Sequence, residues 1–377
     1  MRQKLRLEIS LPLVVLAAFL LCFLIQLYYP LFVHIKLRNY KIEDKKAVQH
    51  PVSVIICARN EEENLRNNLP LILEQDYSDF EVIVVNDCSS DESEWVLKEY
   101  SEKYSRLRIV TLKEHDRFKH GKKFAVTLGI KAAKNEYLLF TDADCRPATQ
   151  NWLNRMQRHF SQETEIVLGY SPYYKTGGFV NTLIRTETFF TAVNYLSYAL
   201  KGNPYMGVGR NLAYKKSLFF RSKGFASHMH IPSGDDDLFV NQNAAQRNTA
   251  IEIHPDAQVW SEPKKTFASY SKQKLRHFGA GKAYKKEHQR MLSLQAGSAI
   301  VFYILAAILL GMKAFLWIVL SAYLLRLIVQ LIVYYPVFKK LNSRDLVFSI
   351  TAFDLIYYFY ILAINLIRLF NKKVQWK

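Results

Sequence analysis

The chain has 377 residues, of which half are hydrophobic and 22% are charged, so its length suits about two or three domains. Its 51 Lys and Arg against 33 Asp and Glu leave a net charge of +18, which suits a nucleotide, a nucleic acid or an acidic membrane surface as partner. This composition excludes a disordered chain, and four cysteines without CxxC spacing exclude a disulfide scaffold and a zinc ribbon.

The first predicted element is a nearly continuous apolar run at 11–33. About 20 apolar residues are enough for a helix to cross a bilayer. A cleaved signal peptide would have a shorter apolar run followed by small residues, whereas this run continues into Tyr28, Tyr29 and Pro30. We therefore predict that residues 1–46 form a transmembrane anchor.

The middle of the chain, 47–293, reads as one α/β domain. Helical segments alternate with short apolar runs: one helix begins after Asn60, a residue that can cap it, one ends near Lys103, and one covers about 122–133. This alternation predicts a mainly parallel, doubly wound sheet, whose ligands bind at the carboxyl ends of the strands. The predicted strands are 52–57, 80–85, 107–112 and 137–141.

Acidic residues follow three of these strands. Glu61 and Asp87 stand after the first and second, and for a single acid such as Asp87 a helix cap and a ligand contact both remain open. Asp142 and Asp144, two positions apart after the fourth strand, can converge on one cation. Mg²⁺ and Mn²⁺ prefer such oxygen ligands, so we predict a Mg²⁺ or Mn²⁺ site at Asp144 and Asp142.

Further motifs follow in a fixed order: Ala58-Arg59-Asn60-Glu61-Glu62, Asp87-x-Ser89-x-Asp91, Gly121-Lys122, Asp142-Ala143-Asp144, Ser233-Gly234-Asp235-Asp236-Asp237-Leu238 and Gln273-Lys274-Leu275-Arg276-His277. With these motifs, about 50–280 resembles the GT-A domain of family 2 glycosyltransferases, the group that contains cellulose, chitin, hyaluronan and poly-N-acetylglucosamine synthases. Two departures stand out: Ala58-Arg59 in the first motif, and His277 in place of a sugar-stacking tryptophan. The second departure disfavours processive polymer synthesis.

The resemblance implies roles for these residues. The nucleotide contacts would be Glu61, Asp87, Lys122, Asp142, Gln273 and Arg276. The catalytic base would come from the acidic segment: alignment on Gly-Asp-Asp favours Asp236, whereas alignment on Leu238 favours Asp235, and we choose Asp236. Adjacent carboxylates repel one another, so at least one of them should have a raised pKa.

These roles imply an inverting transfer, in which one in-line displacement moves the sugar without a covalent enzyme intermediate. A divalent ion stabilises the departing diphosphate as a Lewis acid, and Lys122 and Arg276 add positive charge. The acceptor hydroxyl needs a positioned base. The expected cofactor is therefore Mg²⁺ or Mn²⁺, and the expected donor is a nucleotide-sugar, in the first instance a UDP-sugar.

Two aromatic segments could lie at a membrane surface. The apolar stripe of 177–202 suits either an interfacial helix or a core helix, and both interpretations stay open. The basic segment 266–290 is a second interfacial candidate. Cys57, Cys88 and Cys145 fall near strand ends, where we interpret them as small buried residues of a reduced domain.

Three apolar runs follow within 294–377, and we predict about three transmembrane helices there: 294–312, 314–335, with a hinge at Lys313, and 346–370. Asp354 in the last run is a functional candidate, or else it pairs with Arg326 on the neighbouring span. Basic residues near the spans place 34–293 on the cytoplasmic side of the cell (inner) membrane. Because the positive charge is then partly a topology signal, nucleic acid is not an expected partner.

The sequence therefore predicts a multi-pass membrane glycosyltransferase, a hexosyl- or N-acetylhexosaminyltransferase of polysaccharide biosynthesis, acting on a polysaccharide or lipid-linked acceptor. Two alternatives remain open: a polyprenyl-phosphate sugar synthase, and an inactive scaffold subunit of a polysaccharide export complex. A second copy of the chain or an export partner would be compatible with each of these.

Overall fold

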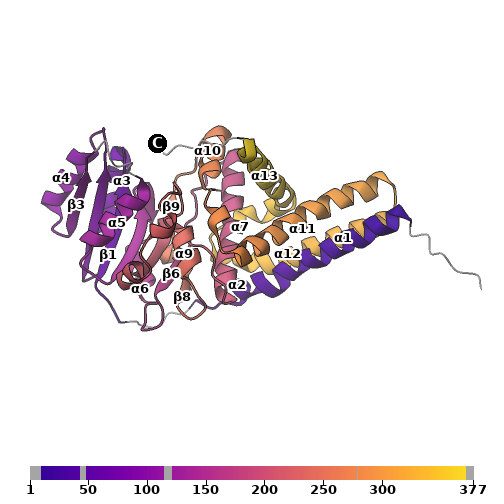
Figure 1. The fold of residues 1–377 in the computed structure, drawn as a ribbon, viewed down its shortest axis with the longest axis horizontal. Coiled ribbons are helices and arrows are strands. Elements are labelled where there is room, and N and C mark those ends of the chain that lie inside the picture. Colours follow the sequence, from indigo (N-terminus) through magenta and orange to yellow (C-terminus); the bar gives the residue numbers. More distant parts are fainter. Residues whose placement is uncertain (1–9, 43–47, 114–120, 278, 371–377) are drawn as a thin grey trace, which may run out of the picture.

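The computed structural model describes residues 10–42, 48–113, 121–277 and 279–370. In Figure 1, an α/β domain lies at one end of the molecule and a bundle of long helices projects from the other. Helix α7 (Gly178–Leu200) lies between them and contacts both β8 (Thr249–Glu252) of the sheet and α13 (Ile350–Phe370) of the bundle (Figure 1).

The centre of the α/β domain is a seven-stranded sheet with the order β3-β2-β1-β4-β7-β6-β8. The first four strands of the chain are mutually parallel, as predicted, whereas β7 is antiparallel to both of its neighbours. Three strands beyond β4 therefore extend the predicted sheet. The bounds are Val52–Ala58 (β1), Phe80–Asp87 (β2), Leu107–Leu112 (β3), Tyr137–Asp142 (β4), Ile166–Gly169 (β6), Leu212–Lys215 (β7) and Thr249–Glu252 (β8).

Strand β1 is buried on both faces, which is why it reads as a continuous apolar run. Val54 and Ile56 belong to the core on one face, and Ile55 to the core on the other. The helices divide accordingly, since α3, α4 and α6 supply residues to the first core and α5 to the second. The sheet is thus covered on both sides, by α3 (Glu62–Leu73), α4 (Ser93–Lys103), α5 (Lys122–Ala132) and α6 (Trp152–Gln157).

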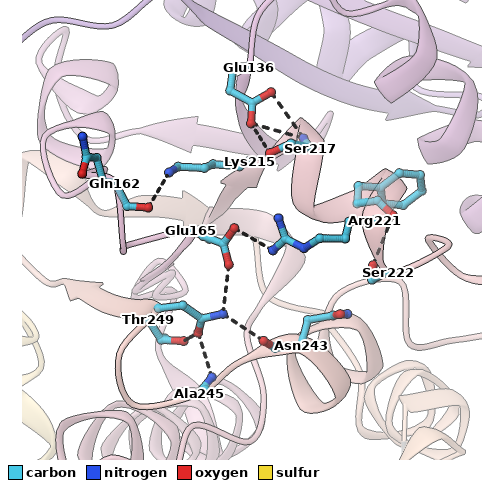
Figure 2. A network of polar contacts seen from close by, with 12 residues as sticks. Glu136, Gln162, Glu165, Lys215, Ser217, Arg221, Ser222, Asn243, Ala245 and Thr249 are labelled. Atoms are coloured by element: carbon cyan, nitrogen blue, oxygen red, sulfur yellow. Dashed lines mark hydrogen bonds and ion pairs between the residues drawn. The ribbon is translucent and has the colours of Figure 1, made fainter.

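Polar side chains hold the β6–β8 edge of the sheet (Figure 2). Glu165 accepts hydrogen bonds from Arg221 of α8 (Lys216–Arg221; Nη2–Oε1 2.7 Å) and from Asn248, which precedes β8 (3.3 Å). Lys215 of β7 donates to the carbonyl oxygens of Ser161 (2.6 Å) and Gln162 (3.3 Å). Figure 2 shows the bond to Gln162. These bonds connect elements within the domain, so we interpret the network as structural.

Helix α7 corresponds to the aromatic stripe for which an interfacial and a core interpretation were open. Phe189, Val193 and Leu196 are fully buried, and Tyr195 donates a hydrogen bond to the carbonyl oxygen of Gly169 in β6 (2.6 Å). These side chains therefore belong to the core that joins the sheet to the bundle. Phe179, in the first turn, is 56% exposed and retains the character of an interfacial residue.

Among the described residues, four helical segments are long and apolar enough to cross a membrane, at Leu11–Asn39, Lys286–Gly311, Leu316–Lys340 and Arg344–Ile364. Their outward side chains are apolar, as a lipid-facing surface requires; Trp317 is 78% exposed and Leu24 62%. Lys313 and Phe315 have positive φ and form the turn where the sequence predicted a hinge. The constituent helices are α1 (Leu11–Tyr28), a π-helical segment (Tyr29–His34), α2 (Ile35–Asn39), α11 (Lys286–Gly311), α12 (Leu316–Lys340) and α13 (Ile350–Phe370).

A buried ion pair connects α12 to α13. Arg326 Nη1 lies 2.7 Å from Asp354 Oδ2, and both side chains are at most 4% exposed. Tyr303 of α11 donates a second hydrogen bond to Asp354, and Arg326 Nη2 donates to Gln26 of α1 at 3.1 Å. Of the two interpretations of Asp354, the pairing with Arg326 is the one that the structure contains.

Candidate active site

Acidic side chains from β2 and β4 meet at one edge of the sheet. Asp87 and Asp142 are the last residues of these strands, which lie on either side of β1. Because all three strands are parallel, their carboxyl ends form one edge. Asp144 follows two residues later, before β5 (Cys145–Pro147). The structure therefore brings together the strand-end carboxylates that the sequence predicted as ligands.

The loops after β1 and β2 are joined by side-chain hydrogen bonds. Asn60, at φ 55°, accepts a hydrogen bond from the backbone N–H of Ser90 (2.7 Å) and donates its own N–H to Ser89 Oγ (3.0 Å). The prediction that Asn60 caps the following helix is wrong: Glu61 is the N-cap residue of α3, and it makes no side-chain cap bond. The amide of Asn60 instead binds the neighbouring loop, so the two loops form one hydrogen-bonded unit.

Two predicted nucleotide contacts lie at this edge. Asp87 is 4% exposed, and its Oδ1 has no hydrogen-bond partner among the described residues. Such a buried acceptor is costly unless a ligand supplies a donor. Burial raises the pKa of Glu61; a hydrogen bond from Asn64 opposes this shift, and the charges of Asp144 and Asp142 add to it. Glu61 therefore lies within the electrostatic field of the acidic pair.

Lys122, the first residue of α5, connects two acidic groups. Its Nζ lies 2.9 Å from Asp142 Oδ1 and 3.2 Å from Asp235 Oδ2. Burial alone would lower the pKa of Lys122, but the charges of Asp142 and Asp235 hold that pKa well above its usual value. The ammonium is therefore charged and links the strand-end aspartate to the acidic segment 235–237.

Asp236, the N-cap residue of α9 (Asp237–Asn243), is fixed by two backbone N–H groups. Its Oδ2 accepts from Gly209 and its Oδ1 from Asp237, both at 2.7 Å. A Cβ at position 209 would stand 3.2 Å from Asp236 Oδ2, so this close approach favours glycine. Burial and the charge of Asp235 raise the pKa of Asp236, while Lys122 and the two N–H groups oppose the shift.

Asp237 instead faces the start of α11, which is a candidate membrane span. Its Oδ2 accepts a hydrogen bond from Tyr284 (2.8 Å), which lies two residues before α11. Burial and the charge of Asp236 raise the pKa of Asp237, whereas the bond from Tyr284 lowers it. Asn241 of α9 also accepts from the backbone N–H of Lys285 (2.8 Å). The acidic segment is thus attached to the start of a candidate membrane span.

One cavity lies between the strand-end and acidic groups. Most of its polar lining comes from the end of β4, the start of α5, the turn before β7 and the acidic segment, and its apolar lining includes Ile55 and Phe140. The ammonium group of Lys122 and several carboxylates therefore surround the same cavity. The residues that line the cavity and carry polar side chains are Cys57, Lys122, Thr141, Asp142, Tyr214, Asp235 and Asp236, and Gly209 adds backbone.

The donor set after β4 fits a hard divalent cation. Asp142, Asp144 and Cys145 can each present one ligand atom within 4.8 Å of the others. Burial and the charges of Asp144 and Asp142 raise the pKa of the Cys145 thiol well above its usual value, which disfavours the thiolate that would bind a soft metal. The two carboxylates are therefore the candidate ligands, and oxygen ligands suit Mg²⁺ or Mn²⁺.

The described side chains of the predicted segment 273–277, those of residues 273–275, are not among the residues that line this cavity. The segment ends helix α10 (Phe267–His277), which packs against α13. Gln273 is not among the cavity's lining residues in the described part of the chain. The side chain of Arg276 lies outside the described residues, so its predicted nucleotide contact remains a prediction.

Two cations near the site were missed by the sequence analysis. The first, Lys123, follows Lys122 at the start of α5. Arg210 stacks on Tyr173, with the guanidinium carbon 4.2 Å from the ring centroid, and donates to the carbonyl oxygen of Ser171 (3.2 Å). Its Nη1 is buried without a hydrogen-bond partner among the described residues. Burial alone would lower the pKa of Arg210, but Tyr173 and nearby acidic groups, including Asp144, raise it.

Residues 53–226 match the family model described as Glycosyl transferase family 2. Among curated proteins, the chain is 36% identical to Glycosyltransferase AglE of Haloferax volcanii over 28% of this chain and 33% of that protein. It is 29% identical to the UDP-Glc:alpha-D-GlcNAc-diphosphoundecaprenol beta-1,3-glucosyltransferase WfaP of Escherichia coli over 35% of this chain and 49% of that protein. The matches thus span a third to a half of these two relatives.

The fold is also similar to a solved structure, the mannosyltransferase PcManGT from Pyrobaculum calidifontis in complex with GDP-Man and Mn²⁺. The two structures align with a TM-score of 0.60 over 92% of this chain and 99% of that one, at 19% identity. At this identity the similarity concerns the fold. The chain therefore carries, at residues 53–226, a region that matches the family model Glycosyl transferase family 2, on a mainly parallel sheet.

Proposed function

We propose that this chain is a membrane-bound, inverting glycosyltransferase. It moves a sugar from a nucleotide-sugar, in the first instance a UDP-sugar, to a polysaccharide or lipid-linked saccharide at the cytoplasmic face of the cell membrane. The observation that carries the proposal is the cavity where Lys122 joins Asp142 to Asp235, beside Asp236. A transferase needs such an arrangement, because charge develops on a leaving phosphate on one side while a proton leaves the acceptor on the other.

The β1–β2–β4 edge would bind the donor. Asp87 offers a buried acceptor oxygen to N–H groups of the nucleobase, and Lys122 offers a cation to the diphosphate. A Mg²⁺ or Mn²⁺ ion held by Asp142 and Asp144 would, when bound, neutralise charge on the departing diphosphate. Once the donor phosphate is in place, Lys122 can exchange a carboxylate partner for a phosphate oxygen.

The acidic segment would activate the acceptor. Asp236 lines the cavity, and its two backbone hydrogen bonds fix the orientation of its carboxylate. Its raised pKa makes the carboxylate a stronger base than an ordinary aspartate, so it can accept the proton of an incoming hydroxyl. Asp235 lines the same cavity and remains the alternative base. A single displacement at the anomeric carbon would invert its configuration.

The proposal is tested by the release of nucleoside diphosphate. Membranes containing the full chain are incubated with a panel of UDP-sugars and with GDP-mannose, with and without lipid extract, in Mg²⁺, Mn²⁺ or EDTA. We expect metal-dependent release of UDP from at least one UDP-sugar, and mass spectrometry of the product then identifies the acceptor. Membranes containing Asp144→Ala serve as the control. If no donor releases nucleotide under any of these conditions, the chain is better described as a scaffold subunit.

The same assay examines transfer to a polyprenyl phosphate. The attachment of the acidic segment to the start of α11 favours an acceptor held at the membrane, which a polyprenyl phosphate would satisfy. A phosphate nucleophile is already ionised and needs no general base. Transfer to polyprenyl phosphate that persists in Asp236→Asn would therefore favour the synthase alternative over transfer to a hydroxyl.

A further inference from the structure

Lys123, beside Lys122 at the start of α5, is buried away from the cavity. Successive residues of a helix point in directions about 100° apart, so the two lysines diverge. Lys123 is 4% exposed, and its Nζ donates hydrogen bonds to the carbonyl oxygens of His228 (2.6 Å) and Ile231 (3.0 Å). No motif in the sequence marks this residue.

These two carbonyl groups belong to a turn that leads into the acidic segment. His228 ends a short 3₁₀ helix (Ala226–His228), and its carbonyl oxygen also accepts from the backbone N–H of Ile231 (3.1 Å). Three residues later, Gly234 adopts φ 94°, and Asp235 and Asp236 follow at the cavity. Lys123 therefore holds the segment immediately before the turn that orients both candidate bases.

The burial of an ammonium group has a cost that the surroundings must offset. Burial lowers the pKa of Lys123 to about 8, and the charges of Asp235, Asp237 and Asp236 oppose this shift. No carboxylate ion pair of Lys123 occurs among the described residues, so two carbonyl dipoles and the field of the acidic segment hold the cation in place. A residue needed only to fill this space would not have to be charged.

We propose that Lys123 is a positioning residue, which clamps the 228–231 turn so that Asp235 and Asp236 face the acceptor side of the cavity. This inference rests on the proposed function for its catalytic consequence. Both lysines then act from the start of α5. Lys122 acts on the donor side of the site, and Lys123 positions the segment that carries the candidate bases. A misplacement of about 1 Å in such a site can lower the rate about 100-fold.

The test compares Lys123→Met, Lys123→Arg and a matched control, Lys131→Met, whose lysine lies near the other end of α5 and is exposed. Turnover is measured as nucleotide release from the donor that the wild type uses best. Binding is measured separately with UDP and with GDP, each with Mn²⁺. We expect Lys123→Met to lower kcat about 100-fold, with unchanged donor KM and nucleotide Kd. Lys123→Arg should recover part of the rate, because its guanidinium can reach the same carbonyl groups.

Hydrogen exchange gives a readout that does not depend on turnover. In Lys123→Met, peptides covering 226–238 should exchange faster than in the wild type, while peptides of β1, β2 and β4 stay unchanged. Lys131→Met should leave both sets unchanged. If the wild type proves inactive on every donor, the proposed function fails, and the exchange data still decide whether Lys123 clamps the turn.

Three results would overturn the inference. The first is wild-type kcat in Lys123→Met, and the second is unchanged exchange over 226–238. The third is a parallel loss of nucleotide binding and kcat that Lys123→Arg does not rescue, because Lys123 would then support the whole fold. If Lys123→Met does not fold, Lys123→Gln, which keeps an uncharged hydrogen-bond donor, takes its place with the same expected split between kcat and KM.

Discussion

Lys122 and Asp235 form an ion pair across the candidate active site, with Nζ and Oδ2 3.2 Å apart. The lysine comes from the helix before β4 and the aspartate from the segment before α9, so the pair joins two separate parts of the domain. Lys122 also binds Asp142, the last residue of β4. The proposed donor and acceptor sides of the site therefore share one cation.

The ion pair with Lys122 distinguishes the two candidate bases, Asp235 and Asp236, by their partners. Asp235 is held by the ammonium, whereas Asp236 is held by backbone N–H groups. We predict that Asp236→Asn abolishes transfer to a hydroxyl acceptor, because the amide cannot accept the proton, while Asp235→Asn keeps measurable activity. Both variants should remain folded in the membrane, as checked by size-exclusion profiles in detergent. The opposite order of activities would make Asp235 the base.

The dependence of nucleotide release on a divalent metal ion should require Asp144. We predict that EDTA abolishes nucleotide release and that Mg²⁺ or Mn²⁺ restores it in the wild type. In Asp144→Ala the added metal should restore little, because one of two proposed ligands is missing. Titration of Mn²⁺ against nucleotide release gives the apparent affinity. Equal metal titrations in wild type and variant would remove Asp144 from the ligand set.

The pH dependence of turnover should report Asp236. Burial and the charge of Asp235 raise its pKa, and a base works in its deprotonated form. Activity should therefore fall as the pH decreases through a value well above the ordinary aspartate pKa of about 4. In Asp235→Asn the neighbouring charge is gone, so the acidic limb should move to lower pH. The measurement is kcat/KM against pH for both forms, and an unmoved limb would assign the titration to another group.

Much of the fold was predictable because burial leaves a strong signal in sequence. Strands β1, β2 and β4 read as apolar runs because they are buried on both faces, and the long helices read as candidate spans because their outward side chains are apolar as well. Strands β6, β7 and β8 were not predicted. Each has four residues, and β7 runs antiparallel between β4 and β6, so the local sequence pattern did not distinguish them from loops.

Site residues could be predicted where they directly follow a predicted strand. They could not be predicted where they reach the site only through contacts between distant parts of the chain. Asp142 and Asp144 come directly after β4, whereas Arg210 reaches the acidic pair only through folding of the turn before β7. Asn60 shows the same limit. Its residue type and its place suggested a helix cap. Instead, its side-chain oxygen accepts a hydrogen bond from the backbone N–H of Ser90, 30 positions later. Neither contact has a local sequence signature.

Arg210 should contribute to donor binding. Its guanidinium is oriented by Tyr173 and Ser171, and its buried Nη1 lacks a partner among the described residues. We predict that Arg210→Met raises the donor KM and lowers kcat/KM about 10- to 100-fold, the loss of one charge-assisted hydrogen bond of roughly 1.5–3 kcal/mol. Arg221→Met, at the polar edge shown in Figure 2, is the matched control and should leave both constants unchanged. An unchanged KM in Arg210→Met would make Arg210 a structural residue.

The Arg326–Asp354 ion pair should stabilise the packing of the candidate membrane helices. Each side chain is buried, and Tyr303 and Gln26 bind the pair from α11 and α1. Removal of one partner leaves the other charge without compensation, so Asp354→Asn or Arg326→Met should each lower the free energy of unfolding by about 3–5 kcal/mol. The double variant Arg326→Met/Asp354→Leu should recover most of this loss, because no buried charge remains. Thermal unfolding in detergent measures the four proteins. A double variant as unstable as the single variants would show that the surrounding hydrogen bonds, and not the charge pair, determine the packing of the helices. A double variant that is stable but inactive would instead indicate a functional role for Asp354.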